Sequence, residues 1–250
     1  MKIKEVIDAL ERFAPLPLQE GYDNAGLQVG LTETEVSGAL LCLDVTESIV
    51  DEALEKRCNL IVSHHPLLFH AIKTLSDINY VQRTVMKAIE NHVTVVSMHT
   101  NLDNARGGVN FKMAEKIGLE DVRFFDEKIA DDVTSGNGVI GVLPTEMDSM
   151  AFIDKVKKVF GVECAQCNQL LHRKISKVAL CGGAGSFLLD DAIKTGADAF
   201  ITGEMHYHDF FGHEQEIQIA VLGHYQTEQY TNEILYSILR EAFPLLSLYM

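Results

Sequence analysis

Short apolar segments of strand length alternate with segments of helical periodicity along most of this chain. In the first half the predicted elements are strands over residues 39–43, 59–63 and 93–97, and helices over 47–57, 77–91 and 109–117. After a less regular stretch, strands follow over 177–181, 198–202 and 217–222, with helices over 187–195 and 228–243. Alternation of this kind is typical of parallel β-α-β units. We therefore predict the α/β fold class.

The two alternating regions resemble each other at a fixed spacing. Ala39-Leu40-Leu41-Cys42 corresponds to Val178-Ala179-Leu180-Cys181, 139 positions later, and the same spacing aligns 51–53 with 190–192 and 60–63 with 199–202. Any two β-α-β units share apolar strands, but shared composition does not explain why polar residues recur at the strand ends. We predict two related α/β lobes from an internal duplication, 1–125 and 126–250, with the strand and helix of 217–243 able to pack back on the first lobe.

Polar side chains that can bind metal come directly after four of the predicted strands. They are His64-His65, then His99 with Asp103, then Glu204 with His206 and His208, and lastly His224 with Glu228. Ligands of open α/β sheets gather beyond the carboxyl ends of the strands. In a helix that begins at His224, the side chain of Glu228 lies on the same face one turn later. Each motif alone is also compatible with ordinary hydrogen bonding, so the prediction depends on their combination.

The combined donor set predicts a site for two divalent metal ions, shared by the two lobes. Three imidazoles and two carboxylates suit borderline ions such as zinc, manganese, iron or nickel, and the ligands we assign are His64, His65, Asp103, His224 and Glu228. Adjacent residues of a regular strand point to opposite faces, and Pro66 favours an extended conformation before it. The two neighbouring imidazoles are therefore expected to diverge and to hold different ions, with Glu228 as the candidate bridge between them.

Further residues at these strand ends have two possible roles. His99, Glu204 and His206 are candidates for orienting the metal ligands or for contacting a substrate. Gly182-Gly183-Ala184-Gly185 comes after a strand, and a tight turn against packed backbone is favoured there over a phosphate cradle. Cys164 and Cys167 form a single C-x-x-C pair without the second pair of a zinc ribbon, and their role stays open.

Composition disfavours two classes of partner. The net charge is −15, from 36 acidic and 21 basic residues, and a nucleic-acid-binding protein needs clustered basic residues. No apolar run approaches the roughly 20 residues of a membrane span, and the first residues lack a signal-peptide apolar segment. The odd number of cysteines, five, argues against a disulfide framework. A cytoplasmic location is the expectation.

With these residues in view, the chain resembles the Nif-three-like family, also called GTP cyclohydrolase I type 2 homologs. The resemblance covers nearly the whole chain and is carried by six motifs in the family's order, namely residues 23–30, 63–66, 99–103, 179–185, 202–205 and 223–228. It implies a Nif-three-like fold, a dinuclear metal site from the first and last histidine motifs with Asp103, and a ring-shaped homohexamer. The length matches family members without an inserted third domain. Val139 stands where many relatives carry arginine. This difference puts an anion contact at that position in doubt but does not affect the predicted metal site.

The function hypotheses belong to different classes. The leading one is a metal-dependent hydrolase of a small molecule, of the GTP cyclohydrolase type, in which two ions activate water. Opening of a purine ring, a phosphoester or a cyclic amide would all fit, and the sequence does not choose among them. The alternative is a non-enzymatic hexameric metal-binding scaffold or regulatory interaction protein. Nucleic-acid binding is disfavoured by charge.

Overall fold

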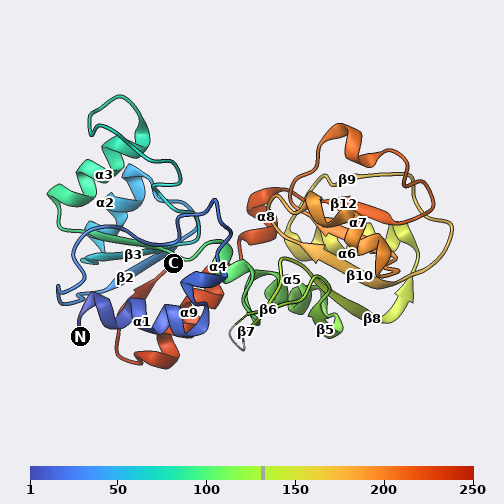
Figure 1. Cartoon of the computed structure of the whole chain (residues 1–250), viewed down its shortest axis with the longest axis horizontal. Coiled ribbons are helices and arrows are strands. Elements are labelled where there is room, and N and C mark those ends of the chain that lie inside the picture. Colours follow the sequence, from blue (N-terminus) through green and yellow to red (C-terminus); the bar gives the residue numbers. More distant parts are fainter. Residues whose placement is uncertain (131–132) are drawn as a thin grey trace. The chain divides into compact units, whose positions relative to one another are not determined.

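The computed structural model describes residues 1–130 and 133–250 and divides the chain into two compact units. Unit 1 comprises Met1–Ala105 and Thr231–Met250, and unit 2 comprises Arg106–Tyr230. Each unit contains a sheet with helices packed against it, and both termini belong to unit 1 (Figure 1). The predicted α/β fold class is confirmed.

Unit 1 is built on a five-stranded sheet. Its strand order is β1 (Gly26–Val29), β4 (Thr94–Ser97), β3 (Leu60–Ser63), β2 (Ala39–Cys42) and β13 (Leu248–Tyr249). The strands β2, β3, β4 and β13 run parallel, and β1 pairs antiparallel with β4. Every residue of β2, β3 and β4 is buried. Burial on both faces explains why these strands are continuous apolar runs and do not alternate with polar residues.

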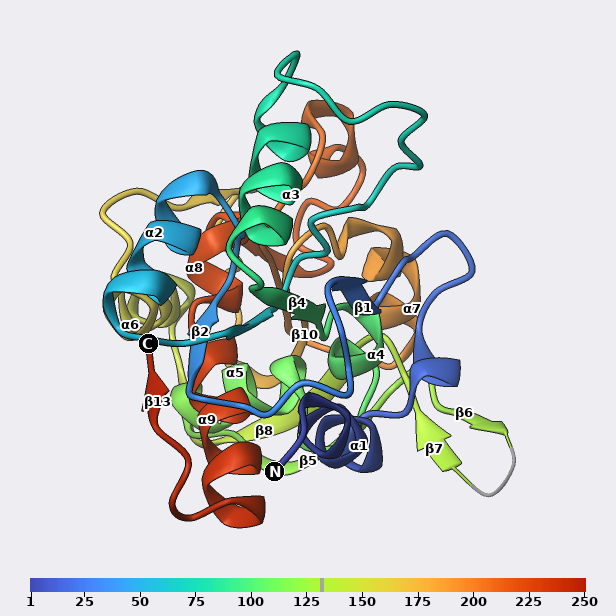
Figure 2. The same cartoon turned by 90° about the vertical axis from the view of Figure 1, so that its left-hand side faces the viewer.

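Two pairs of longer helices cover this sheet. The helices α2 (Glu47–Glu55) and α3 (Tyr80–Glu90) lie side by side, as do α1 (Ile3–Phe13) and α9 (Thr231–Ala242) (Figures 1 and 2). The side chains of Thr46 and Asn79 cap α2 and α3 by accepting hydrogen bonds from Ile49 and Gln82 backbone N–H groups. Two short helices, η1 (Leu16–Leu18) and α4 (Thr100–Asp103), complete the unit.

Unit 2 contains a six-stranded sheet. Its order is β5 (Glu120–Phe124), β8 (Val139–Met147), β10 (Ile175–Cys181), β11 (Ala199–Thr202), β12 (Gln218–Val221) and β9 (Gln166–Cys167). The central strands β10, β11 and β12 are parallel, whereas β8, β5 and β9 pair antiparallel with their neighbours. A separate hairpin joins β6 (Lys128–Ala130) to β7 (Val133–Ser135).

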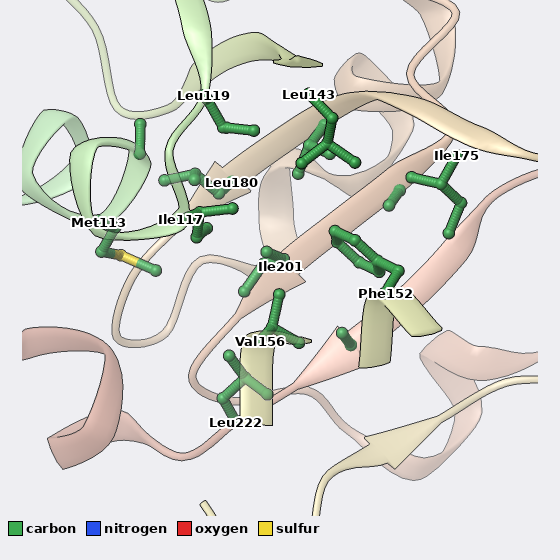
Figure 3. Packing of buried hydrophobic residues seen from close by; sticks show 14 of the residues in the cluster. Met113, Ile117, Leu119, Leu143, Phe152, Val156, Ile175, Leu180, Ile201 and Leu222 are labelled. Atoms are coloured by element: carbon green, nitrogen blue, oxygen red, sulfur yellow. The ribbon is translucent and has the colours of Figure 1, made fainter. Parts of the chain in front are cut away.

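Helices pack on this sheet through two apolar clusters. The helices of unit 2 are α5 (Val109–Ile117), α6 (Ser149–Phe160), η2 (Ser186–Leu188), α7 (Leu189–Lys194), η3 (Tyr207–Phe210) and α8 (His224–Glu228). Phe152 and Val156 of α6 pack with Leu180 and Ile201 of the sheet (Figure 3). The second cluster joins Phe200 and Ile219 to α7 and η2. Among the described residues, the helices are all too short or too polar to cross a bilayer.

The first two parallel strands of each unit have equivalent pairing. Ala39 lies opposite Leu60, and Val178 lies opposite Ala199, which is the correspondence expected from the spacing of 139 residues. The third strands lead into helices that begin differently. His99 occupies the N-cap position of α4 without a side-chain capping bond, whereas His224 is the first residue of α8. The duplication itself stays a prediction.

The boundaries between the two units differ from the expected boundary at residue 125. Unit 2 begins at Arg106, because α5 packs on β8 and β10. The segment 217–243 is divided, since β12 belongs to the sheet of unit 2 while α9 packs on α1 and β2 in unit 1. A single helix over 228–243 was predicted, but the structure ends α8 at Glu228 and begins α9 at Thr231.

Phe152 provides a test of the unit 2 core. Its side chain is fully buried, so Phe152→Ala should lower the free energy of unfolding by about 3–5 kcal/mol through lost burial and a cavity. Met150, on the same helix, is 55% exposed, and Met150→Ala should change stability by less than about 0.5 kcal/mol. Urea unfolding followed by circular dichroism measures both variants. Equal midpoints for the two variants would contradict this packing.

Candidate metal centre

In unit 1 the backbone of His64 and His65 is held by hydrogen bonds beyond the end of β3. The His64 and His65 N–H groups donate to the carbonyls of Cys42 (3.1 Å) and Leu43 (2.9 Å), so both residues are tied to the end of the neighbouring strand β2. The hydroxyls of Ser63 and Ser97 both donate to the His65 carbonyl, at 2.9 and 3.2 Å. The position of the histidine pair is therefore set by the ends of three parallel strands.

Three imidazoles gather at this point. The ring centroids of His64 and His65 lie 4.8 Å apart, and the His99 ring lies 5.3 and 5.5 Å from them. One ring nitrogen of each residue lies within 4.8 Å of the others, an arrangement that can hold a metal ion. The expected divergence of His64 and His65 to opposite faces is not seen, because both residues lie past the end of β3, where strand alternation no longer applies.

Each of these rings has its Nδ1 atom against an oxygen acceptor. His64 Nδ1 lies 2.8 Å from the Met98 carbonyl oxygen, and His65 Nδ1 lies 2.9 Å from Asp44 Oδ1. His99 Nδ1 lies 2.7 Å from Asp23 Oδ1. A carbonyl or carboxylate oxygen can only accept, so each Nδ1 carries the proton and donates. In the neutral rings the lone pair is then on Nε2, which is the atom that would bind a metal ion.

Asp103 adds a carboxylate to the cluster. It is the last residue of α4, and its Oδ1 lies 3.7 Å from His64 Nε2. The side chain of His64 is fully buried, and that of Asp103 is 22% exposed. The backbone N–H of Asp103 donates to the His99 carbonyl at 3.1 Å, so the short helix with His99 at its N-cap position also positions Asp103.

A cysteine also lies at the end of β2, next to this cluster in the fold. Cys42 accepts the His64 N–H bond through its carbonyl. Burial raises the pKa of its thiol to about 12, and the nearby carboxylates of Asp44 and Glu52 contribute to the rise. The thiol therefore stays protonated at neutral pH and is a poor metal ligand in that form.

Asp23 holds one side of the cluster through several hydrogen bonds. It accepts from His99 Nδ1, from the Thr100 hydroxyl and from the Thr100 and Asn24 backbone N–H groups. Burial alone would raise the pKa of Asp23, but the hydrogen bonds from His99 and Thr100 outweigh it and lower the pKa to about 2. Asp23 therefore combines a local bond from Asn24 with contacts to residues 76 and 77 positions away.

Unit 2 contains a second group of donors. His224 and Glu228 occupy the first and last positions of α8, with His224 Nε2 3.1 Å from Glu228 Oε2, as their spacing predicts. His224 Nδ1 lies 3.0 Å from Oε1 of Glu204, which lies just beyond β11. Glu228 is buried, whereas Glu204 lies at the surface. Glu204 therefore fixes the imidazole in the manner that Asp44 and Asp23 fix those of unit 1.

The carboxylates around His224 make it a site for positive charge. The hydrogen bond to Glu228 raises the pKa of His224 against the opposing effect of burial, and the charges of Glu228 and Glu204 raise it further. A proton or a metal ion can supply that positive charge, so metal binding here would release the proton.

The glycine-rich turn after β10 packs directly against α8. Gly183 has a φ of +55°, and a Cβ atom at this position would overlap Glu228 Oε1 and lie 3.3 Å from His224 Nε2. The Gly183 N–H donates to the Thr227 hydroxyl at 3.0 Å. The glycines form a turn after β10, as predicted, and Gly183 packs against the side chains of α8.

The remaining residues singled out in the sequence lie away from these groups. The His206 backbone N–H donates to Asp209 at the start of η3, and its side chain is exposed. Cys164 and Cys167 are both exposed, and Cys167 lies on the edge strand β9. Burial and the neighbouring Cys164 raise the pKa of the Cys167 thiol. A substrate-binding role for His206 stays a prediction.

Three residues of the unit 1 group were not predicted from the sequence. They are Asp44, which accepts from His65, and the two serines Ser63 and Ser97 that hold the His65 carbonyl. Ser63 is 34 residues from Ser97. Their positions could have identified them, since each of these residues lies at or just beyond the end of a parallel strand.

Fold and donors together define an α/β protein with histidine–carboxylate clusters that can bind a metal ion. Residues 1–249 match the Duf34/NIF3 (NGG1p interacting factor 3) family, and the chain belongs to this family.

Relatives and solved structures agree with this assignment. A Clostridium perfringens protein named GTP cyclohydrolase 1 type 2 homolog is 35% identical over 229 residues, covering 91% of this chain and 87% of the relative. A Clostridium acetobutylicum protein of the same name is 33% identical over 230 residues, covering 91% and 85%. A hypothetical protein of Staphylococcus aureus has a similar structure, with a TM-score of 0.90, 25% identity, and coverage of 100% of this chain and 95% of that one.

Asp23→Asn should remove the carboxylate that the Asp23 hydrogen bonds stabilise. Because the pKa of Asp23 falls from 3.8 to about 2 on folding, its ionised form contributes up to about 2 kcal/mol of stability above pH 4. That contribution is lost as the pH falls from about 4 toward 2. Urea unfolding with a chelator present should show the variant less stable at pH 7, with a difference that narrows below pH 4. A difference independent of pH would contradict this role.

Gly183→Ala should destabilise the protein by two effects, a backbone cost and a clash. A control variant at another glycine separates them. The positive φ costs about 1–2 kcal/mol for a residue with a Cβ atom, and the added methyl group would clash with Glu228. Gly196 has a φ of +72° with no atom within 4 Å of its Cβ position, so Gly196→Ala bears only the first cost. Thermal unfolding should show a larger loss for Gly183→Ala. Equal losses would show that Glu228 does not lie against the turn.

Proposed function

We propose that this protein binds two divalent metal ions through His64, His65, Asp103, His224 and Glu228. The proposal is supported most by one observation that recurs in both units. Every imidazole of the group donates from Nδ1 to a fixed oxygen, which assigns Nε2 as the metal-binding atom. In this proposal His99 and Glu204 are positioning residues: Asp23 holds the His99 ring beside those of His64 and His65, and Glu204 orients His224.

The donor types decide which ions fit. Imidazole nitrogen with carboxylate oxygen suits zinc, manganese, iron or nickel, whereas the buried Cys42 thiol stays protonated. Glu228 is the candidate for the bridging carboxylate, because it is buried and lies beside His224 Nε2. The negative charge of Asp103, Glu228 and Glu204 would offset the charge of the ions.

The reaction that we propose is hydrolysis of a small molecule. Bound divalent ions would lower the pKa of a water molecule and polarise a carbon or phosphorus centre. The name GTP cyclohydrolase 1 type 2 homolog, carried by the relatives, points to opening of a purine ring as the first reaction to test. Phosphoesters and cyclic amides have the same requirement for an activated water molecule.

The assembly that we propose follows from the family resemblance. We propose a homohexamer in the cytoplasm, with the metal ligands facing an interior space that small molecules can enter. Light scattering after size exclusion measures the assembly mass independently of metal content. The net charge of −15 gives no support to nucleic acid as a partner.

Metal analysis of protein purified without chelator tests the ligand assignment. The wild type should hold two ions per chain, and Asp103→Asn should hold at most one. Glu228→Gln should weaken binding of both ions if Glu228 bridges them. His172 is exposed and lies outside both donor groups, so His172→Ala should keep two ions. If Asp103→Asn and Glu228→Gln both kept two ions per chain, the assignment of Asp103 and Glu228 as metal ligands would be wrong.

A hydrolase screen on the same preparations tests the reaction. Purine nucleotides, phosphoesters and cyclic amides are offered to metal-loaded wild type and to the Glu228→Gln variant. Turnover that requires both the ions and Glu228 supports the hydrolase. Two bound ions with no turnover on any of the three classes would contradict the hydrolase and favour the metal-binding scaffold.

A further inference from the structure

Two exposed aromatic rings lie beside the histidine cluster of unit 1. Tyr22 is 67% exposed and Phe69 is 39% exposed, and their ring centroids lie 6.5 Å apart in an edge-to-face arrangement. We call these two residues the aromatic rim. Leu67, two residues before Phe69, is buried in the apolar core of the unit and anchors the loop. The rim therefore keeps apolar ring surface in contact with solvent.

The rim is held in place by a hydrogen-bonded frame. Asn24 Nδ2 donates to the Leu68 carbonyl at 2.8 Å, which ties the turn that carries Tyr22 to the loop that carries Phe69. The buried Gln28 side chain joins the same two segments, donating to the Asn24 carbonyl at 2.6 Å and accepting from the Leu68 N–H at 3.0 Å. Such a frame places both rings before any ligand arrives, which lowers the cost of ordering them on binding.

Ring contacts connect the rim with the metal ligands. The Phe69 ring lies 6.0 Å from the His99 ring, at an interplanar angle of 86°. His99 in turn lies 5.3 and 5.5 Å from the rings of His64 and His65. A continuous series of rings thus leads from the exposed Tyr22 to the buried His64.

We propose that the aromatic rim binds the planar unsaturated ring of a nitrogen heterocycle and directs it toward the histidine cluster. This inference rests on the proposed function for the identity of the neighbouring metal ions, but the stacking itself requires only Tyr22 and Phe69. Aromatic side chains stack on heterocyclic bases through their faces, and this contact tolerates different ring substituents. The rim therefore selects for planarity of the ligand, while the histidine cluster selects for the group to be hydrolysed.

Equilibrium dialysis with neutral nucleosides tests the rim, since such probes lack a phosphate group that could bind the metal ions. Guanosine should bind wild-type protein, and uridine should bind more tightly than 5,6-dihydrouridine, whose ring is saturated and not planar. Phe69→Leu and Tyr22→Leu keep apolar volume without an aromatic face and should each weaken guanosine binding roughly tenfold. Tyr80, at the start of α3, is 56% exposed, and Tyr80→Leu should leave binding unchanged.

Metal content is measured on every sample, and guanosine binding is measured with and without loaded metal. Weakened binding with unchanged metal content supports the rim. Equal guanosine affinity in wild type and both rim variants, or no binding by wild type, overturns it while leaving the metal assignment intact. If Phe69→Leu lost both its metal and its guanosine binding, the proposal would also be overturned, because Phe69 would then act only by supporting His99. If the wild type binds guanosine through the rim but contains no metal, only the metal proposal is contradicted.

Discussion

The candidate metal centre depends on one recurring interaction, the hydrogen bond that an imidazole Nδ1 donates to an oxygen fixed by the fold. His64 donates to a backbone carbonyl, and His65, His99 and His224 donate to Asp44, Asp23 and Glu204. Each bond fixes both the tautomer and the direction of the ring. Because the acceptors lie at strand ends or in turns packed against them, the sheets determine where the coordinating nitrogens point. Changes to the strands would therefore reach the site through these acceptors.

The parallel strands were largely predictable because their burial on both faces leaves continuous apolar runs in the sequence. The predicted strand over 59–63 and the observed β3 differ by one residue, and the predicted helix over 109–117 is identical with α5. Edge strands were not predictable in this way. The pairing of β1 with β4 and of β13 with β2 depends on contacts between residues far apart in the sequence. The break between α8 and α9 carries no glycine or proline to mark it.

In the site too, contacts between residues close in the sequence were predictable, whereas contacts between distant residues were not. The spacing of His224 and Glu228 predicts their contact, because residues four apart share a helix face. The contact of His65 with Asp44 spans 21 residues, and that of His99 with Asp23 spans 76. No periodicity connects such positions, so only the assembled sheet reveals them. The tandem histidines were expected to diverge as strand residues do, and they differ because the strand ends before them.

The way in which unit 1 is assembled has a consequence for biosynthesis. Its last strand, β13, and its helix α9 come from residues 231–250, whereas all of unit 2 lies within residues 106–230. During translation, unit 2 can therefore complete its core while unit 1 still lacks the partner of β2 and the helix that packs on α1. Until β13 is made, the backbone N–H and C=O groups on this edge of β2 lack their strand partner.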